Sequence, residues 1–381
     1  MIAVATLSFW FSALLLFHVF MGYPLCMWWL ARALPRRVRK EVATPTMTMP
    51  TVTVVIAAHE AGAHIRAKLT NVFALDYPGE RLDIIVVCDG CRDDTAEQCR
   101  QVSDPRIRVL ELAERRGKAS CLNDGIAAAT GDVLLMTDVR QNLDPAALRE
   151  LVANLADPAV GAVSGELKLL DALTGFARGV DAYWRYEKLL RHAESRSGST
   201  IGVTGALYAM RRELFRPLPA GTVLDDVLIP MRIAAAGRRV VFEPLALAWD
   251  RPSQQPAEER RRKIRTLAGN YQLIQLAPWL LVPWSNPLWW RFVSHKLLRL
   301  LAPWLLLLLT LSSAVLATRH ALYLVPLLAL VAGVGLVVLA QRLPAAGHMW
   351  PVRLVVAFWY LNLFAAQALI AFARNRRLHL W

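Results

Sequence analysis

Cysteine, lysine and acidic side chains are all scarce in this sequence of 381 residues. Its five cysteines are odd in number and scattered, which excludes a small secreted domain held together by disulfides. Asp and Glu total 30 against 44 Lys and Arg, so the net charge is +14 and an acidic disordered tail is also excluded. We interpret the cysteines as reduced thiols of a reducing compartment.

Several binding motifs are missing too. No GxGxxG follows the first predicted strand and no GxxxxGK[ST] occurs, so a dinucleotide site and a P-loop ATPase lose their main support. Cys88-Asp-Gly-Cys91 has CxxC spacing but no second pair, so it does not predict zinc. The basic residues flank apolar segments, and no aromatic-basic module accompanies them, so we expect no nucleic-acid partner.

Charge is absent from four long apolar runs, and the mean hydropathy of the chain is +0.34. Residues 1–31 contain no Asp, Glu, Lys or Arg and lack an A-x-A cleavage site, which distinguishes them from a signal peptide. The other runs are Leu300–Thr318, Ala321–Gln341 and Leu354–Ala373. About 20 apolar residues suffice to cross a bilayer, so we expect an integral membrane protein of the cell membrane with four spans.

The basic residues between 32 and 40 follow the first run and predict a cytoplasmic catalytic domain, with the N-terminus outside. Three later spans would leave Arg374, Arg376 and Arg377 outside, against the same rule. Thr266–Trp290, which is interrupted by Gly269 and three prolines and is rich in tryptophan, is interpreted as helices lying in the membrane interface. A fourth C-terminal span is the alternative.

These features divide the chain into five parts. They are a transmembrane helix (1–31), a basic linker (32–50), a cytoplasmic domain (51–265), interfacial amphipathic helices (266–295) and a C-terminal transmembrane region of about three helices (296–381). Within the cytoplasmic domain, β-branched runs alternate with helical stretches, which predicts an α/β fold with a mostly parallel sheet. The expected strands are Thr51–Ala58, Asp83–Cys88, Ile107–Leu110 and Asp132–Met136.

Polar residues follow three of these strands, and ligands of open α/β sheets bind at the carboxyl ends of strands. The residues are His59, Glu60, Asp89 and Asp138. Arg115, Arg116 and Lys118 lie on the loop before the helix expected at Ala119–Ala129. Carboxylates at this edge are suited to the base and ribose of a nucleotide, and the cations to its phosphates.

The chain resembles the family 2 glycosyltransferases of the GT-A fold, in particular membrane-embedded polysaccharide synthases such as the cellulose, hyaluronan and chitooligosaccharide synthases. The resemblance covers about residues 51–303 in order. The matching segments are VVIAAHEA (54–61), VVCDGCRDDT (86–95), RRGKASCLNDG (115–125), LLMTDVRQ (134–141), VTGALYAMRR (203–212), LDDVLIPMRIAAAGRRVVFEP (224–244), ERRRKIRTLAGNYQL (259–273) and SHKLLRLLAP (294–303).

The resemblance implies inverting transfer of a sugar from a nucleotide-sugar, a UDP-sugar, to a saccharide or lipid-linked acceptor at the membrane, in exopolysaccharide or glycolipid synthesis. It implies Asp226 as the catalytic base, and Thr204, Gly205 and Asp225 as acceptor-binding residues. The nucleotide-sugar-binding residues that it implies are His59, Glu60, Asp89, Lys118, Asp138, Arg262 and Arg265. The residues alone also fit a simpler interpretation of Asp225-Asp226 as a helix N-cap pair.

Two motifs depart from the family pattern. The DxD motif reads Asp138-Val139-Arg140, so either Asp138 holds Mg²⁺ or Mn²⁺ with fewer protein ligands, or Arg140 itself meets a phosphate. The QxxRW motif aligns with residues 262–266, where Thr266 replaces the aromatic ring and weakens the prediction of long-polymer synthesis. The basic residues from Arg260 to Arg265 equally fit a collar against anionic lipid headgroups.

Two alternatives remain open at this point. The missing aromatic residue at position 266 favours a non-processive lipid glycosyltransferase. A non-catalytic subunit that binds nucleotide-sugar or helps to translocate a polymer would use the same binding residues without the base.

Overall fold

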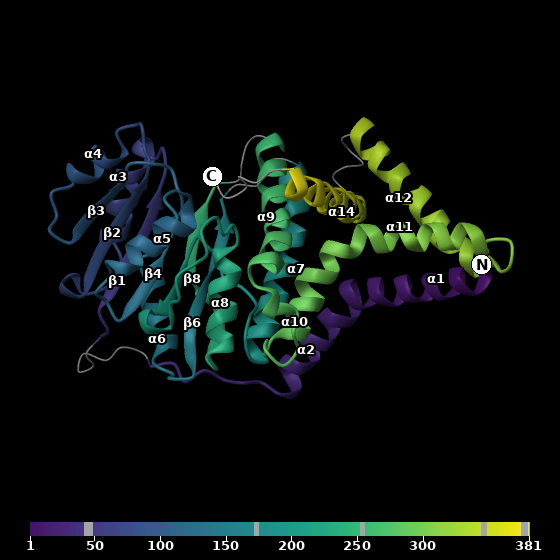
Figure 1. Cartoon of the computed structure of the whole chain (residues 1–381), viewed down its shortest axis with the longest axis horizontal. Coiled ribbons are helices and arrows are strands. Elements are labelled where there is room, and N and C mark those ends of the chain that lie inside the picture. Colours follow the sequence, from purple (N-terminus) through teal and green to yellow (C-terminus); the bar gives the residue numbers. More distant parts are fainter. Residues whose placement is uncertain (42–48, 171–174, 252–255, 344–348, 375–379, 381) are drawn as a thin grey trace.

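An eight-stranded mixed sheet occupies one half of the molecule and long helices extend from it (Figure 1). The computed structural model describes residues 1–41, 49–170, 175–251, 256–343, 349–374 and 380. The strand order is β3-β2-β1-β4-β7-β6-β8-β5. The strands are β1 (Val52–Ala58), β2 (Leu82–Asp89), β3 (Ile107–Leu112), β4 (Val133–Met136), β5 (Asn142–Leu143), β6 (Val160–Leu169), β7 (Tyr208–Arg211) and β8 (Arg239–Asp250).

The first four strands match the four predicted from the sequence, and they pair in parallel. The second half of the sheet differs, because β7 runs antiparallel to both β4 and β6. The α/β prediction is thus confirmed, and the sheet is mixed. The helices of this half are α3 (Gly62–Phe73), α4 (Thr95–Arg100), α5 (Lys118–Ala127), α6 (Ala147–Leu155), α7 (Gly175–Arg196), α8 (Asp225–Ala235) and α9 (Pro256–Leu276).

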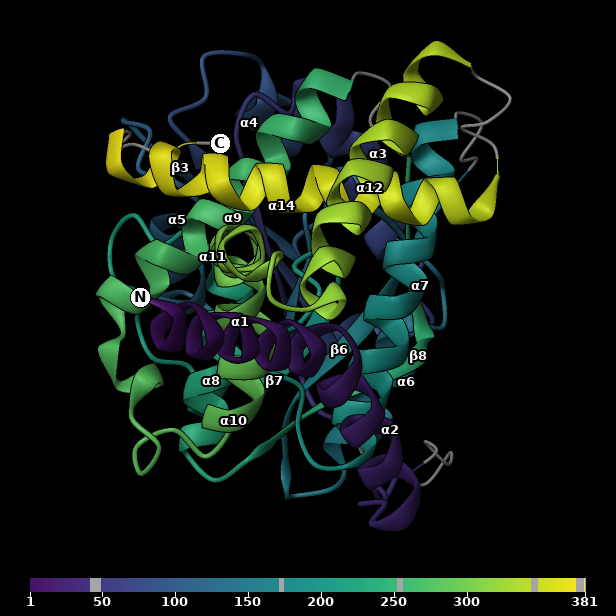
Figure 2. The same cartoon turned by 90° about the vertical axis from the view of Figure 1, so that its right-hand side faces the viewer.

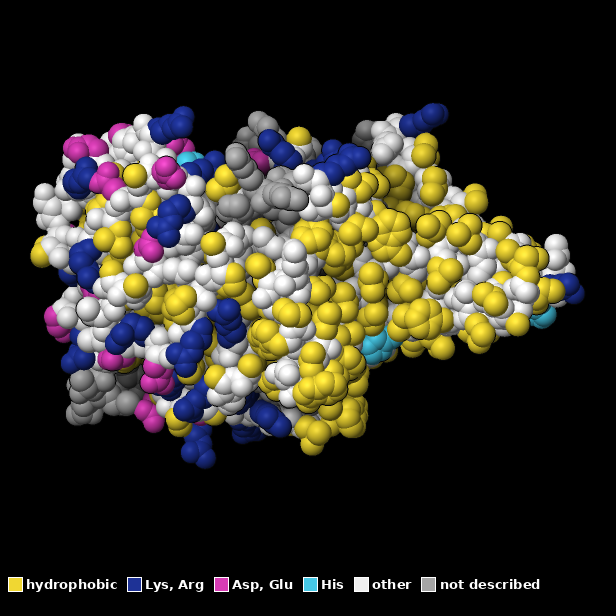
Figure 3. Space-filling model, viewed as in Figure 1, with side chains coloured by type: hydrophobic (Ala, Val, Ile, Leu, Met, Phe, Trp, Pro, Cys, Tyr) yellow, Lys and Arg dark blue, Asp and Glu magenta, His cyan; other side chains and the backbone are white. Residues whose placement is uncertain are grey.

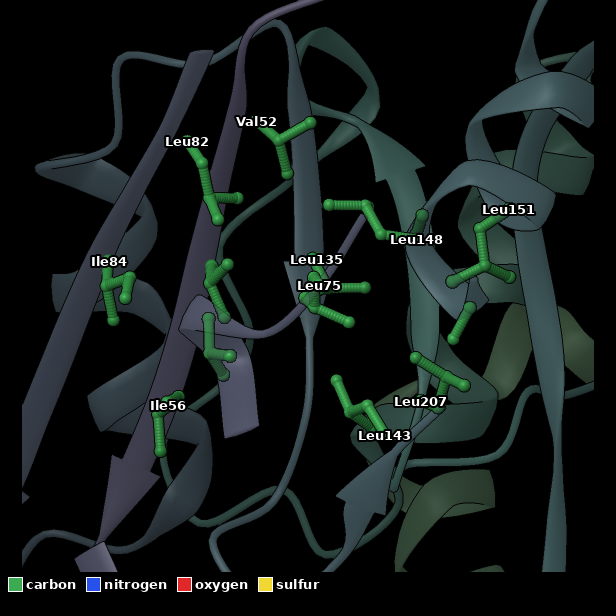
Figure 4. Packing of buried hydrophobic residues seen from close by; sticks show 14 of the residues in the cluster. Val52, Ile56, Leu75, Leu82, Ile84, Leu135, Leu143, Leu148, Leu151 and Leu207 are labelled. Carbon is green, nitrogen blue, oxygen red and sulfur yellow. The ribbon is translucent and has the colours of Figure 1, made fainter. Parts of the chain in front are cut away.

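Both faces of the sheet are buried, as the continuous apolar character of its strands requires. Val54 and Ile56 of β1 belong to one apolar cluster, whereas Val55 on the same strand belongs to the other, because successive side chains point to opposite faces. Helices α3 and α6 cover the first face, and α5 and α8 cover the second. Figure 4 shows the first cluster, including Val52, Ile56, Leu82, Ile84, Leu135, Leu148 and Leu151.

Four helical segments are long and apolar enough to cross a membrane, by length and composition. Helices α1 (Ile2–Phe17) and α2 (Tyr23–Ala33) form the first, and α10 (Trp289–Phe292) with α11 (Leu298–Leu316) forms the second. The third contains α12 (Leu324–Arg342), and the fourth is α14 (Trp350–Arg374). They overlap the four charge-free runs, and the second begins at Trp289, within the segment 266–295 that was predicted to be interfacial. Hydrophobic side chains cover this half of the molecule in Figure 3.

The expected break at Gly269 does not occur, because α9 continues through it to Leu276. A Cβ atom on Gly269 would lie 2.9 Å from side-chain atoms of both Val223 and Leu224, so this glycine permits a close approach between α9 and the chain before α8. Helix α9 therefore crosses the domain boundary predicted at residue 265. A 3-10 turn at Pro278–Leu281 follows it, within the segment predicted to be interfacial.

A buried polar network joins the sheet half to the long apolar helices. His295 lies between two carboxylates, with Nδ1 2.7 Å from Glu194 and Nε2 2.7 Å from Glu187. Tyr23 Oη donates to Glu194, and Arg299 donates to Glu187. Because α7 supplies both acids and the long apolar helices supply their partners, the network fixes how the two halves meet.

Candidate active site

The ammonium group of Lys118 is the point at which distant segments of the chain converge. Its Nζ atom lies 2.7 Å from Asp138 Oδ1 and 3.7 Å from Asp225 Oδ2. Lys118 begins α5, Asp138 follows β4, and Asp225 begins α8. A Cβ atom on Gly205 would lie 3.6 Å from Lys118 Nζ and 3.8 Å from Asp226 Cβ, so Gly205 and Asp226 belong to the same cluster as Lys118.

Lys118, Asp138, Asp225 and Asp226 form what we call the acidic cluster, and their charges perturb one another. Burial by itself would lower the pKa of Lys118, but the carboxylates of Asp138 and Asp225 outweigh it and hold that pKa above its usual value. Burial, together with the negative charges of Asp226 and Asp138, raises the pKa of Asp225 to about 6, although Lys118 opposes the rise. At neutral pH Lys118 therefore keeps its proton, and it lies beside Asp225, whose pKa of about 6 is close to that pH.

Two buried oxygens face this cluster without a hydrogen-bond partner among the residues that the structure describes. They are Asp225 Oδ2 and Tyr208 Oη. Burial and the negative charges of Asp225 and Asp226 raise the pKa of Tyr208 well above its usual value, so its hydroxyl keeps a proton to donate. A buried polar atom without a hydrogen bond lowers the stability of a fold. The position of these two atoms therefore marks a place where a ligand would complete the hydrogen bonding.

Asp89 lies at the same edge of the sheet but is fully buried. Its two oxygens accept hydrogen bonds from the backbone N–H groups of Arg116 (2.6 Å) and Gly117 (2.8 Å). Asp89, which was predicted to bind the nucleotide-sugar, thus holds the loop that carries Lys118. Gly90 allows this loop to come close, because it has φ +57° and a Cβ atom there would lie 2.4 Å from Arg115 N.

His59 and Glu60 follow β1 beside Asp89. The Nδ1 atom of His59 lies 2.7 Å from the backbone carbonyl oxygen of Asp89. Glu60 has an unusual φ of +48°, and its Oε1 accepts from the N–H of Arg92 at 2.9 Å. Both contacts tie the ends of β1 and β2 together. The structure therefore brings His59, Glu60 and Asp89 to one edge, which the Arg116–Lys118 loop links to the acidic cluster.

The predicted residues of α9 divide into two groups. Burial lowers the pKa of Arg265, and the charges of Asp225 and Asp138 oppose this effect, so Arg265 lies within the field of the acidic cluster. Arg262 is exposed and lies 4.0 Å from Glu259 of the same helix. Thr266 is exposed as well. Of the predicted α9 residues, Arg265 is the one that the fold brings to the cluster.

Thr204 and the two acids of α8 are held by hydrogen bonds around the cluster. Thr204 Oγ1 accepts from Arg191 at 3.0 Å, and the N–H of Val203 donates to the backbone oxygen of Asp226 at 2.9 Å. Leu224 is the N-cap of α8, and Asp225 and Asp226 are its first two helical residues. The N-cap interpretation of this pair is therefore wrong, because the chain enters the helix one residue earlier. Their charges still favour the helix N-terminus.

The altered DxD motif has a partner that the sequence did not reveal. Arg140 Nη2 lies 3.1 Å from Asp250 Oδ2, and Gln141 Nε2 donates to the same oxygen at 2.8 Å. Arg140 is thus paired within the fold. Within the described part of the chain, no group of three or more histidine, cysteine or acidic side chains is arranged so that it could hold a metal ion by itself.

Two residues near the site were missed by sequence reasoning. Lys68 is buried, and its Nζ donates to Thr137 Oγ1 (2.8 Å) and to the backbone oxygen of Gln141 (2.7 Å) on either side of Asp138. Burial lowers its pKa to about 7. Tyr208 is the other. A lysine inside an amphipathic helix and a tyrosine in a strand carry no signal of their own, although Tyr208 lies within the matching segment 203–212.

A cavity of about 510 Å³ opens at the opposite end of β4, lined in part by Lys40, Glu150, Arg211 and Arg212. None of the predicted site residues is among the described residues that line it. We favour the carboxyl ends of the strands as the site, because the ionisable groups converge there and ligands of open sheets bind at that edge.

Comparisons with known proteins agree with this architecture. A family model described as "Glycosyltransferase like family 2" matches residues 50–269, more than half of the chain. The poly-beta-1,6-N-acetyl-D-glucosamine synthase of Staphylococcus aureus (strain COL) is 24% identical over 230 residues, covering 58% of this chain and 55% of that protein. The probable glycosyltransferase YdaM of Bacillus subtilis (strain 168) is 27% identical over 250 residues, covering 59% and 56%. The chain thus spans just over half the length of these curated relatives.

A solved structure is similar over nearly the whole chain. It is a mannosyltransferase from Pyrobaculum calidifontis in complex with GDP-Man and Mn²⁺, and it is 26% identical, with a TM-score of 0.70. The match covers 96% of this chain and 98% of that one, so the likeness extends to the long apolar helices as well as the sheet.

The contacts of Asp89 predict that Asp89→Asn destabilises the protein. The substituted amide would turn an NH₂ group toward one of the two backbone donors and leave a buried N–H unpaired, which costs about 1–3 kcal/mol. We expect a lower thermal unfolding midpoint for the full chain in detergent. Glu114→Gln, an exposed change in the same loop, is the matched control. An Asp89→Asn protein as stable as this control would contradict the role of Asp89 in holding the loop.

Proposed function

The chain belongs to the family 2 glycosyltransferases, and from that membership we propose that it transfers a sugar from a nucleoside-diphosphate-sugar. The proposed acceptor is a saccharide or a lipid-linked molecule at the membrane surface, and the transfer inverts the anomeric configuration. One observation carries the proposal. Lys118, Asp138, Asp225 and Asp226 converge from three separate segments at the carboxyl ends of the strands.

Lys118 and Arg265 are proposed to bind the donor diphosphate. Lys118 is the first residue of α5, whose N-terminus adds a partial positive charge. The ammonium group lies 2.7 Å from Asp138 Oδ1 and 3.7 Å from Asp225 Oδ2. Negative charge that develops on the leaving diphosphate would be stabilised by these fixed cations. His59, Glu60 and the loop held by Asp89 would form the nucleoside end of the same site.

A divalent cation fits this site as an ion shared with the donor. Magnesium-type sites with phosphate ligands need one or two carboxylates from the protein, and Asp138, whose side chain is 33% exposed, offers one. We propose that Asp138 holds Mg²⁺ or Mn²⁺ together with the diphosphate. When bound, such an ion neutralises charge on the leaving group. The Mn²⁺ in the similar mannosyltransferase structure supports this assignment.

Asp226 is proposed as the catalytic base. As the acceptor oxygen bonds to the anomeric carbon, its proton passes to Asp226, and the bond from that carbon to the diphosphate breaks, so the electron pair leaves with the nucleoside diphosphate. This is a single displacement with no glycosyl-enzyme intermediate. Asp225 Oδ2 and Tyr208 Oη, which accept or donate no hydrogen bond among the described residues, are proposed to hydrogen-bond the acceptor or the transferred sugar.

The donor is proposed to be a UDP-sugar, and the poly-beta-1,6-N-acetyl-D-glucosamine synthase relative supports an N-acetylglucosamine donor in polysaccharide synthesis. A GDP-sugar is the second candidate, because the similar solved structure holds GDP-Man. The exposed Thr266, in place of an aromatic platform, favours short products or a lipid acceptor over a long polymer. Nucleotide-sugars are cytoplasmic metabolites, which accords with the proposed cytoplasmic position of the sheet domain.

The assignment of the base is tested with Asp226→Asn. We expect transfer by the purified full chain to fall by about 10²–10⁴-fold, because proton removal is lost while the donor contacts remain. The assay supplies UDP-GlcNAc, UDP-Glc or GDP-Man in turn and identifies products by mass. Asp76→Asn, a surface change distant from the cluster, is the control. Transfer at the wild-type rate by Asp226→Asn would remove Asp226 as the base, and absence of transfer from all donors by the unmodified chain would contradict the proposed function.

The titration of Asp225 predicts a pH dependence. Above about pH 6 its carboxylate is ionised, and below this value it gains a proton and no longer balances Lys118 or strengthens the neighbouring base. We expect kcat/KM to fall as the pH drops through about 6. In Asp225→Asn the rate should be low and nearly independent of pH across the same range. An identical acidic limb in that variant would show that another group is responsible.

A further inference from the structure

The last long helix, α14, lies across the other membrane helices. In Figure 1, α1 and α11 run together away from the sheet, and the start of α1 packs against the end of α11 through Ala5, Phe9 and Leu316. Figure 2, turned by 90°, shows α11 end-on, whereas α14 crosses the view at full length. A bilayer that α11 crosses therefore has α14 nearly in its plane.

One side of α14 rests on helices of the catalytic half. It contacts both α7 and α9. Arg260 of α9 donates through Nε (3.3 Å) and Nη2 (3.0 Å) to Gln367 Oε1 of α14. The rings of Tyr271 and Phe372 stack with their centroids 5.8 Å apart. These contacts hold α14 against α9 near Arg260 and near Tyr271.

The charge of α9 excludes it from the hydrocarbon core. Seven of the eight residues from Glu258 to Arg265 are ionisable, and Arg260, Arg261 and Arg262 are exposed. Charged side chains inside a bilayer are costly and rare. Because α14 packs against α9 and contacts Arg260 directly, a bilayer-crossing α14 would bring these charges toward the core with it. The other side of α14 contacts α11 and α12, which places the helix between the two halves.

The side chains of α14 suit the boundary between water and lipid. Asn362 is buried within the protein, and Tyr360 Oη lies 3.2 Å from Gln341 Nε2 of α12. Arg353 and Arg374 lie near its two ends, while Leu354 and Ile370 remain exposed. A helix that carries both polar and exposed apolar side chains is typical of an interfacial segment. The length and mean hydropathy of α14 alone would also permit a span.

We infer that α14 lies in the surface of the bilayer and that the chain crosses it three times, through α1–α2, α10–α11 and α12. The end of α14 then lies on the same side as the catalytic domain. That this side is the cytoplasmic one rests on the proposed function. The topology now obeys the positive-inside rule, because Arg374 at the end of α14 lies on the side of the basic linker. The partner of this helix is the headgroup layer, which its exposed apolar residues and terminal arginines meet.

The experiment inserts one short epitope into the full chain at one of three positions, giving three tagged proteins: after His320, after Leu343 and after Trp381. Antibody access is measured in intact and in permeabilised cells. We expect the epitopes after Leu343 and Trp381 to lie on one side and the epitope after His320 on the other, because α12 crosses and α14 does not. Epitopes after Leu343 and Trp381 on opposite sides would overturn the inference.

Sugar transfer by each tagged protein checks that it is folded. This readout is separate from the topology, because antibody access does not depend on catalysis. If the unmodified chain transfers no sugar, the proposed function fails while the positions of the epitopes still decide whether α14 crosses.

Discussion

The ammonium group of Lys118 is the interaction on which the site depends. Asp138, Asp225 and Asp226 would repel one another if they were brought together without a cation, and Lys118 reaches two of them directly. The loop that carries Lys118 is held in turn by Asp89 through two backbone amides. A bound diphosphate would add negative charge to this balance, which explains why Arg265 and a shared divalent ion belong to the proposed site.

The parallel half of the sheet was predictable because β1, β2 and β4 are short β-branched or aliphatic runs that are buried on both faces. The other half was not. Strand β5 has only two residues, and β7 (YAMR) is not the continuous aliphatic run that marks β4 (VLLM), so neither was recognised. Their strand conformation comes from pairing with β8, β4 and β6, which are neighbours distant in sequence.

The acids of the site could be found in the sequence, since Asp138 follows a strand and Asp225-Asp226 lies in a family motif. Lys118 was predicted as a site residue too, but its pairing with Asp138 and Asp225 was not. Whether Asp89 faces a ligand or the amides of Arg116 and Gly117 depends on how closely two loops approach, which Gly90 permits. The direction of α14 was equally hidden, because hydropathy counts apolar residues and does not report what a helix lies against. Its packing on α9, with the helix in the bilayer surface as inferred, removes the conflict with the positive-inside rule.

The most direct test of the proposed site is a structure of the full chain with a bound nucleoside-diphosphate-sugar and Mn²⁺. We predict diphosphate oxygens within hydrogen-bonding distance of Lys118 Nζ, the ion beside Asp138, and the anomeric carbon facing Asp226. A donor bound elsewhere, for example in the cavity at the opposite end of β4, with the Lys118–Asp138 ion pair left intact, would contradict the proposal.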